Sequence, residues 1–123
     1  MNLRTGIDLV EIVRLEEAIR RHGRRFLERI YTPQELTEVG PNLASLAGRF
    51  AAKEAVAKAL GTGIGLVAWR EIEILPGPER APLLHLHGAA ARKAEELGLS
   101  TWSISISHTH QYAVAVATAI GDE

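Results

Sequence analysis

The sequence predicts a single α+β domain in which an antiparallel sheet packs against one long central helix. Three observations predict this fold class. A helical pattern runs from about Leu43 to Leu60 and ends at the glycine-rich segment 61–65. The alternating segments 102–107 and 111–120 predict a hairpin across residues 108–110. Helices followed by antiparallel strands are typical of α+β domains, and 123 residues suffice for one hydrophobic core.

The first third of the chain predicts one strand and two helices. Residues 3–10 alternate between apolar and polar and predict a strand. A helix is expected from about residue 12 to residue 31, with a weak point at Gly23. Residues 32–35 form a capping box with a proline at the first helical position, so a short helix begins there, and Pro41 closes it.

The elements after the central helix are shorter. Residues 69–75 and 83–87 predict two strands around a turn at residues 76–78. Residues 89–97 predict a helix that stops at Gly98. The whole chain, residues 1–123, is therefore expected to form one domain.

Composition excludes several classes of protein. The hydrophobic share of 46% and the charged share of 24% are ordinary for a globular protein, and the net charge of -1 argues against general affinity for nucleic acid. Without cysteine there is no disulfide, thiolate zinc site or cysteine nucleophile, and we expect a cytoplasmic protein. No segment approaches the roughly 20 apolar residues of a membrane span, and the N-terminal residues do not resemble a signal peptide.

The central helix carries a carboxylate on its apolar face. At 100° per residue, Glu54 falls within the stripe formed by Leu43, Leu46, Ala47, Phe50 and Ala57. Lys58 lies one turn further on, at the edge of the stripe, whereas Arg49 and Lys53 share another face. A partly buried carboxylate needs a cation or hydrogen-bond donors, so this arrangement suggests a metal or phosphate site.

Asp8 is the natural companion of Glu54 in such a site. It stands near the end of the first strand, where an aspartate is most often a capping or turn residue. Paired in space with Glu54, it would provide two carboxylates for Mg²⁺, which completes its coordination with water and substrate phosphates. Arg49, Lys53 and Lys58 could then hold the remaining phosphate charge.

Two further patterns have both a structural and a functional interpretation. Arg14, Arg21 and Arg25 align on one side of the first helix, either as a solvated face or as a docking stripe for an acidic partner. His22, on the opposite side, is expected to pack in the core. Ser107, His108 and Thr109 form either a polar turn or a set of donors for a phosphate or ribose.

The remaining motifs are weak. The glycine-rich segment 61–65 lacks the lysine and serine or threonine of a P-loop, so we interpret it as a helix stop and a mobile loop beside the site. The pairs His85/His87 and His108/His110 would allow a zinc site, but no carboxylate neighbours them in sequence.

Four segments together resemble the holo-acyl-carrier-protein synthases, the short bacterial type of 4′-phosphopantetheinyl transferase. They are Gly6-Ile-Asp-Leu-Val-Glu-Ile12, Arg29-Ile-Tyr-Thr32 with Glu35, residues 46–63 containing Lys53-Glu-Ala-Val-Ala-Lys58, and Ser103-Ile-Ser-Ile-Ser-His-Thr109. The resemblance spans nearly the whole chain. Ala52 stands where the wider superfamily has tryptophan, which matches the short subgroup.

The resemblance implies a reaction and a site. The phosphopantetheine arm of coenzyme A would move to a serine of acyl carrier protein, with Asp8 and Glu54 holding Mg²⁺ and Lys58 contacting the phosphates. Arg49, Lys53, Ser107, His108 and Thr109 would line the coenzyme A pocket. The basic first helix, with Arg14, Arg21 and Arg25, would dock the acidic carrier protein. The family forms homotrimers with sites between subunits, and the general base is left open between Glu54 and His108.

Two other functions use the same features differently. A magnesium-dependent nucleotide phosphohydrolase would employ the two carboxylates with water as the nucleophile. A non-catalytic adaptor would bind acidic helical partners through the arginine stripe, but it would leave Asp8, Glu54 and Lys58 unexplained.

Overall fold

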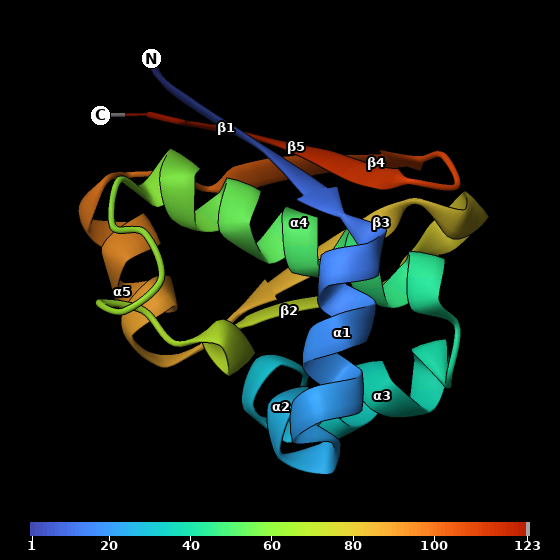
Figure 1. The fold of residues 1–123 in the computed structure, drawn as a ribbon. Helices are drawn as coiled ribbons and strands as arrows, with labels where there is room; N and C mark the ends of the chain where they lie inside the picture. Colours follow the sequence, from blue (N-terminus) through green and yellow to red (C-terminus); the bar gives the residue numbers. More distant parts are fainter. Residues whose placement is uncertain (123) are drawn as a thin grey trace.

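The helices lie on one face of a three-stranded antiparallel sheet in the computed structural model, which describes residues 1–122 (Figure 1). The sheet has the order β1 (Asn2–Glu11), β5 (Tyr112–Gly121) and β4 (Thr101–His108). Gly6 of β1 and Ile104 of β4 both pair with Ala117 of β5. The predicted hairpin of the last two strands is therefore confirmed, and β1 adds to its free side.

The central helix α4 (Leu43–Leu60) crosses the inner face of this sheet. Asn42 caps its first turn by accepting a hydrogen bond from the Ser45 amide at 2.9 Å, and Gly61 ends it in a left-handed conformation. The facing side chains of β5 are alanines at 113, 115, 117 and 119, all buried. These small residues let the helix approach the sheet closely, so α4 is buried around most of its circumference rather than along a single stripe.

Three short helices form a second core at one end of α4. They are α1 (Ile12–His22), α2 (Arg24–Ile30) and α3 (Pro33–Val39). The single helix predicted for residues 12–31 is wrong, because Gly23 adopts φ 61° and ψ -140° and divides it into α1 and α2. The prediction that His22 packs in the core is also wrong, because this side chain is exposed at the break. The predicted capping box of α3 is confirmed by reciprocal hydrogen bonds between Thr32 and Glu35.

A two-stranded sheet lies beyond α4, formed by β2 (Ile72–Pro76) and β3 (Pro82–Leu86). The strand predicted from residue 69 begins later, because residues Trp69–Glu71 form a short 3₁₀ turn (η1) in which Glu71 accepts a hydrogen bond from the Ala68 amide. A second turn (η2, Pro78–Arg80) joins the two strands, and helix α5 (Gly88–Glu96) follows them. In the described part of the chain, no helix is long and apolar enough to cross a membrane.

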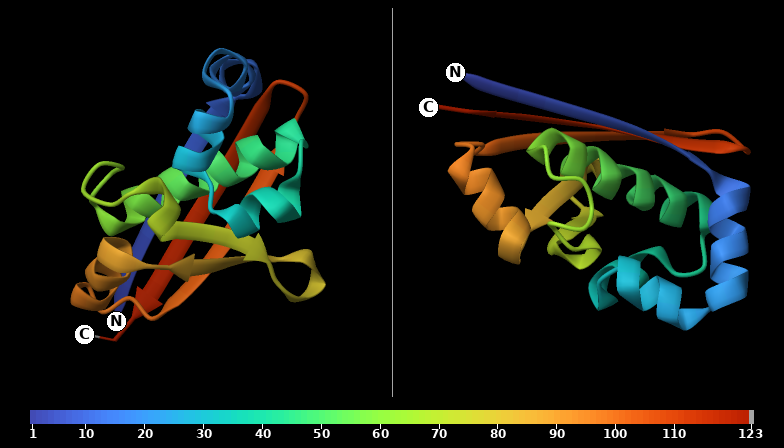
Figure 2. Two further views of the ribbon diagram at one scale, coloured as in Figure 1. Left: turned by 90° about the horizontal axis from the view of Figure 1, so that it is seen from below. Right: turned by 60° about the vertical axis from the view of Figure 1, so that its left-hand side comes forward.

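Among residues 1–122, no helix covers the outer face of the three-stranded sheet (Figure 2). On β1 it presents Leu3, Ile7 and Leu9, which are 58–64% exposed. Their register partners on β5 are Ile120, Val116 and Val114. The serines of β4 continue the same face, because Ser105 pairs with Val116 and Ser107 with Val114. A broad apolar strip therefore faces outward along β1 and β5.

Candidate active site

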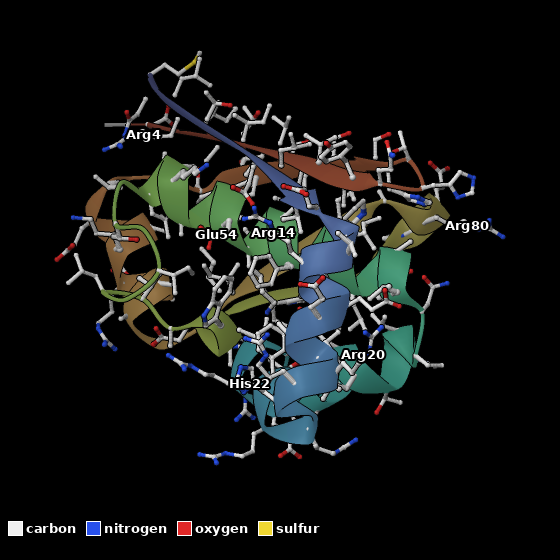
Figure 3. All side chains as sticks on the ribbon, viewed as in Figure 1. Arg4, Arg14, Arg20, His22, Glu54 and Arg80 are labelled. Atoms are coloured by element: carbon white, nitrogen blue, oxygen red, sulfur yellow. The ribbon has the colours of Figure 1, made fainter. Side chains whose placement is uncertain are left out.

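Asp8, Glu54 and Lys58 meet where β1 passes α4. The alternation of β1 points Asp8 toward the helix, while Ile7 and Leu9 point to the outer face. Lys58 reaches across to β1, with its Nζ 3.1 Å from Asp8 Oδ1 and 2.9 Å from the Ile7 carbonyl oxygen. Glu54 lies one turn before Lys58 on α4, on the side that faces α1 (Figure 3). The predicted proximity of the three residues is thus seen in the structure.

The two carboxylates form a site suited to a cation. Burial raises the pKa of Glu54, the negative charge of Asp8 raises it further, and Lys58 opposes both effects. The side chain of Asp8 is only 17% exposed. Two partly buried carboxylates with hard oxygen donors fit Mg²⁺, which commonly binds one or two carboxylates together with substrate phosphates. A divalent ion bound here would offset the repulsion between Glu54 and Asp8.

These carboxylates open into a cleft of about 490 Å³ between α1, α4 and the end of β1. Arg14 of α1 lies in the same cleft as Asp8 and Glu54, as the side-chain view also shows for Arg14 and Glu54 (Figure 3). Its other walls are mostly apolar and come from α1, α2, α4 and β5: Leu15, Ala18, Phe26, Phe50 and Tyr112. Sequence analysis did not assign these walls, although Phe50 precedes Glu54 by one turn on the predicted stripe.

Arg49 and Lys53 point away from this cleft. The Nε of Arg49 donates to the Ile74 carbonyl oxygen of β2 at 3.0 Å, and burial lowers the pKa of this guanidinium. Lys53 is fully buried and pairs with Glu35 of α3 at 2.8 Å. Sequence analysis connected Glu35 with the capping box but not with Lys53, because a pairing between two helices cannot be found from local spacing.

The arginines of the proposed docking stripe divide into two places. Arg14 lies at the carboxylate cleft, whereas Arg21 and Arg25 line a separate concavity of about 460 Å³ with His22, Phe26 and Arg29. Arg14 and Arg21 stand two turns apart on α1, and Arg25 follows the break at Gly23 on α2. The concavity of Arg21, Arg25 and Arg29 is basic, whereas in the cleft Arg14 pairs with Glu11 at 3.5 Å.

Ser107, His108 and Thr109 lie far from the carboxylates within one chain. His108 and Thr109 line a shallow concavity with Leu43 and Ala44, at the start of α4. Eleven residues of helix separate Leu43 from Glu54, which corresponds to about 16 Å. The hydroxyl of Thr109 accepts hydrogen bonds from the amides of Gln111 and Tyr112 and so shapes the turn. Within residues 1–122, no group of three or more His, Cys, Asp or Glu side chains is placed to hold a metal ion, so the histidine pairs do not gather into a zinc site.

A buried helix crosses an antiparallel sheet, and two carboxylates and a lysine lie together at the crossing. The chain belongs to the 4′-phosphopantetheinyl transferase superfamily, whose pattern it matches over residues 4–117.

The chain is similar in sequence and in structure to several holo-[acyl-carrier-protein] synthases. The chain is 47% identical to a holo-[acyl-carrier-protein] synthase of Herpetosiphon aurantiacus, over 95% of this chain and 98% of that protein. It is 50% identical to one of Moorella thermoacetica, over 94% and 91%. The crystal structure of the Helicobacter pylori holo-[acyl-carrier-protein] synthase in complex with coenzyme A superposes with a TM-score of 0.86 at 38% identity, covering 94% of this chain and 99% of that one.

Proposed function

We infer that this chain is an enzyme that transfers the 4′-phosphopantetheine group of coenzyme A to a serine of apo-acyl carrier protein, in support of fatty acid biosynthesis. The second product is adenosine 3′,5′-bisphosphate. The observation that carries this inference is the meeting of Asp8, Glu54 and Lys58 in one cleft, in a chain whose relatives are holo-[acyl-carrier-protein] synthases. The H. pylori relative is known in complex with coenzyme A.

The residues of the cleft suit phosphoryl transfer, which depends mainly on alignment and on neutralising charge. We assign Asp8 and Glu54 as the ligands of Mg²⁺, which when bound offsets the charge of the pyrophosphate. Lys58 supplies a further positive charge beside Asp8 and is half-exposed, so its Nζ can turn to a substrate phosphate. At the mouth of an apolar cleft, the catalytic charges would act in a lower dielectric than water.

Glu54 is the group we propose as general base. Its carboxylate lines the cleft together with Asp8 and Arg14, where the carrier serine would enter. The serine hydroxyl gives its proton to Glu54 while its oxygen forms a bond to the phosphorus that carries pantetheine. The bond from that phosphorus to the bisphosphate breaks, and the bisphosphate leaves with the electron pair. His108 lines the concavity beside Leu43 and Ala44 rather than the carboxylate cleft, and it is assigned to coenzyme A instead.

The basic surface of α1 and α2 is proposed as the docking site for the acidic carrier protein. Arg14 stands in the cleft itself, and Arg21 and Arg25 extend the positive charge along the same end of the molecule. Attraction between opposite charges would guide the carrier serine toward Asp8 and Glu54. Phe26 lines both concavities, so an apolar side chain of the partner would find a contact between the arginines.

We further propose that the protein works as a homotrimer with each site shared between two subunits. The outward apolar strip of β1 and β5, with Leu3, Ile7 and Leu9 more than half exposed, supports association through this sheet face. Ser107 lies on the same face, and His108 and Thr109 follow it in the chain. These residues, distant from Asp8 within one chain, would then complete the coenzyme A pocket of a neighbouring subunit, together with Arg49.

The assembly is tested with Ile7→Asp. Ile7 is 58% exposed, so the substitution should leave the isolated subunit folded but should make the apolar strip unable to associate. We expect light scattering to give the mass of three chains for the wild type and of one chain for the variant, with transfer activity lost in the latter. Leu83→Asp, at a 46% exposed position of β3, is the matched control and should stay trimeric. An Ile7→Asp variant with an unchanged mass would refute the proposed interface.

The reaction is tested by measuring the intact mass of apo-acyl carrier protein after incubation with this protein, coenzyme A and Mg²⁺. We expect a rise of about 340 Da, one phosphopantetheine arm, that disappears when the metal is chelated. Consumption of coenzyme A without a rise would instead indicate a nucleotide phosphohydrolase. Binding of the carrier with coenzyme A intact would indicate an adaptor. We place the enzyme in the cytoplasm, where both substrates would be available.

A further inference from the structure

A fully buried ion pair lies behind the candidate site and has no place in the reaction described above. The Nζ of Lys53 is 2.8 Å from Glu35 Oε1, and both side chains are 0% exposed. Lys53 Nζ also donates to the carbonyl oxygens of Trp69, at 3.1 Å, and Ile72, at 2.5 Å. All three protons of the ammonium group are thereby used, so Lys53 has no donor left for a substrate.

Glu35 is equally saturated. Its Oε1 accepts a second hydrogen bond from the Thr32 amide at 2.8 Å, and its Oε2 accepts one from the Ile74 amide at 2.8 Å. The pair therefore joins three elements: α3 through Glu35, α4 through Lys53, and β2 with its preceding turn through Trp69, Ile72 and Ile74. No buried side-chain nitrogen or oxygen in residues 1–122 lacks a hydrogen-bond partner, so the network is complete.

Stability alone is a weak reason for such a pair. Removing two charges from water costs free energy that their attraction often fails to offset, and apolar residues of similar volume can be as stable or more so. Burial lowers the pKa of Lys53, and the charge of Glu35 offsets part of this effect. Unlike an apolar pair, an ion pair is directional. Its hydrogen bonds form in only one arrangement of α3, α4 and β2.

The position of the pair connects it to the site. Lys53 immediately precedes Glu54, so the direction of Glu54 is 100° around α4 from that of Lys53. One turn earlier, Arg49 donates to the Ile74 carbonyl oxygen. Helix α4 is thus tied to β2 at two successive turns, by Arg49 and by Lys53. On its other side, α4 meets Gly6 of β1 so closely that a Cβ at Gly6 would lie 1.9 Å from the Ala55 carbonyl oxygen. The helix has little freedom to rotate about its axis.

We propose that the Lys53–Glu35 pair is a positioning device that fixes the rotation of α4 and so holds Glu54 and Lys58 beside Asp8. Lys53 acts through the helix rather than by touching coenzyme A. This inference rests on the proposed function, because it assigns the purpose of the device to the metal and phosphate site. It also gives Lys53 a role different from the pocket lining that the family resemblance implied.

The test is the double variant Lys53→Met/Glu35→Gln, which removes both charges without leaving either one unpaired in the core. The readout besides activity is Mn²⁺ binding, followed by electron paramagnetic resonance of the free ion in the presence of coenzyme A. We expect Mn²⁺ affinity and kcat each to fall about ten- to a hundredfold, as when groups that orient metal ligands are lost. The KM for carrier protein should change less than about twofold, since the arginines of α1 are not tied to the pair.

The control is Leu99→Ala, a buried residue at the far end of the sheet from the carboxylates. It should lower the melting temperature without changing Mn²⁺ affinity or kcat, which separates positioning from general destabilisation. If the double variant does not fold, Lys53→Gln/Glu35→Gln, which replaces both charges by amides that can still form hydrogen bonds, is judged by the same measurements. A folded variant with the Mn²⁺ affinity and kcat of Leu99→Ala would overturn the positioning role. Absence of transfer by the wild type would overturn the proposed function instead.

Discussion

Replacing Gly6 by alanine should separate the two halves of the candidate site. Gly6 stands on the inner face of β1, two residues before Asp8, where the strand meets α4. A Cβ there would lie 1.9 Å from the Ala55 carbonyl oxygen and 2.9 Å from the Ala59 amide nitrogen. Both neighbours are backbone atoms of a helix, so no side chain can turn aside to make room. The backbone of Gly6 is not in the left-handed region, and the effect is therefore purely steric.

The size of the effect follows from these distances. The added carbon falls about 1.5 Å short of ordinary van der Waals contact, so strand and helix must move apart by roughly that amount. Overpacking of this kind typically costs about 1–3 kcal/mol, which would lower the melting temperature of a chain of this size by roughly 10 °C at the upper end. A displacement of about 1 Å between groups that must align can reduce a rate by about a hundredfold. We therefore expect kcat to fall about a hundredfold or more.

The assay is the transfer of phosphopantetheine to carrier protein, followed by intact mass, together with thermal unfolding by circular dichroism. Gly48→Ala is the matched control, because Gly48 lies in α4 and its Cβ would meet only the Cγ2 atom of Ile106, at 2.8 Å. This contact is 0.9 Å longer than that at Gly6 and involves a side chain rather than the helix backbone, and alanine favours the helix by about 1 kcal/mol over glycine, which offsets the shift of Ile106. Gly48→Ala should keep its activity and melting temperature. If Gly6→Ala did the same, the close approach of β1 and α4 would not be what aligns the site.

Three further predictions concern the same surface. Asp8→Ala and Glu54→Ala should each abolish transfer while the circular dichroism spectrum stays native; near-normal turnover of either variant at saturating Mg²⁺ would remove the metal assignment. Because burial and Asp8 raise the pKa of Glu54, its carboxyl group takes up a proton at a higher pH than an ordinary glutamate and then no longer binds a cation. Mn²⁺ affinity should therefore weaken on acidification while the pH is still above the ordinary value of 4.5, and a titration with constant affinity through that range would contradict this. Reversing Arg14 and Arg21 to glutamate should raise the KM for carrier protein about tenfold or more and leave that for coenzyme A unchanged; equal effects on both would argue against docking at this surface.

The helices and strands that depend on a local pattern of residues were predicted well from the sequence. The capping box at Thr32, the helix from Leu43 to Leu60 and the alternation of the last two strands each depend on residues within one or two turns of one another. The predictions failed where a contact with a distant segment or an unusual backbone conformation determines the structure. Gly23 was recognised as a weak point, yet its positive φ fully divides the predicted helix, and this break exposes His22.

The candidate site was predictable in part for the same reason. Glu54 and Lys58 share a helix, so their spacing alone put them together. Their meeting with Asp8 came from interpretation of residue type, and the structure shows it as a contact of 3.1 Å between Lys58 and Asp8. The orientation of Lys53 could not be predicted from spacing. By spacing it resembles another phosphate ligand, but the fold directs it into the core against Glu35.

The sequence by itself determined the fold class, the carboxylate and lysine spacing of α4, and the family to which the chain belongs. These depend on short-range periodicity and on motifs, which survive in a linear string of residues. Only the tertiary structure decided which charges face the cleft, which are buried as a pair, and which apolar residues face outward from the sheet. Those outcomes depend on packing between different elements, from 18 residues apart for Lys53 and Glu35 to 50 for Lys58 and Asp8. There the surface of the partner element, and not the local chain, decides between burial and exposure.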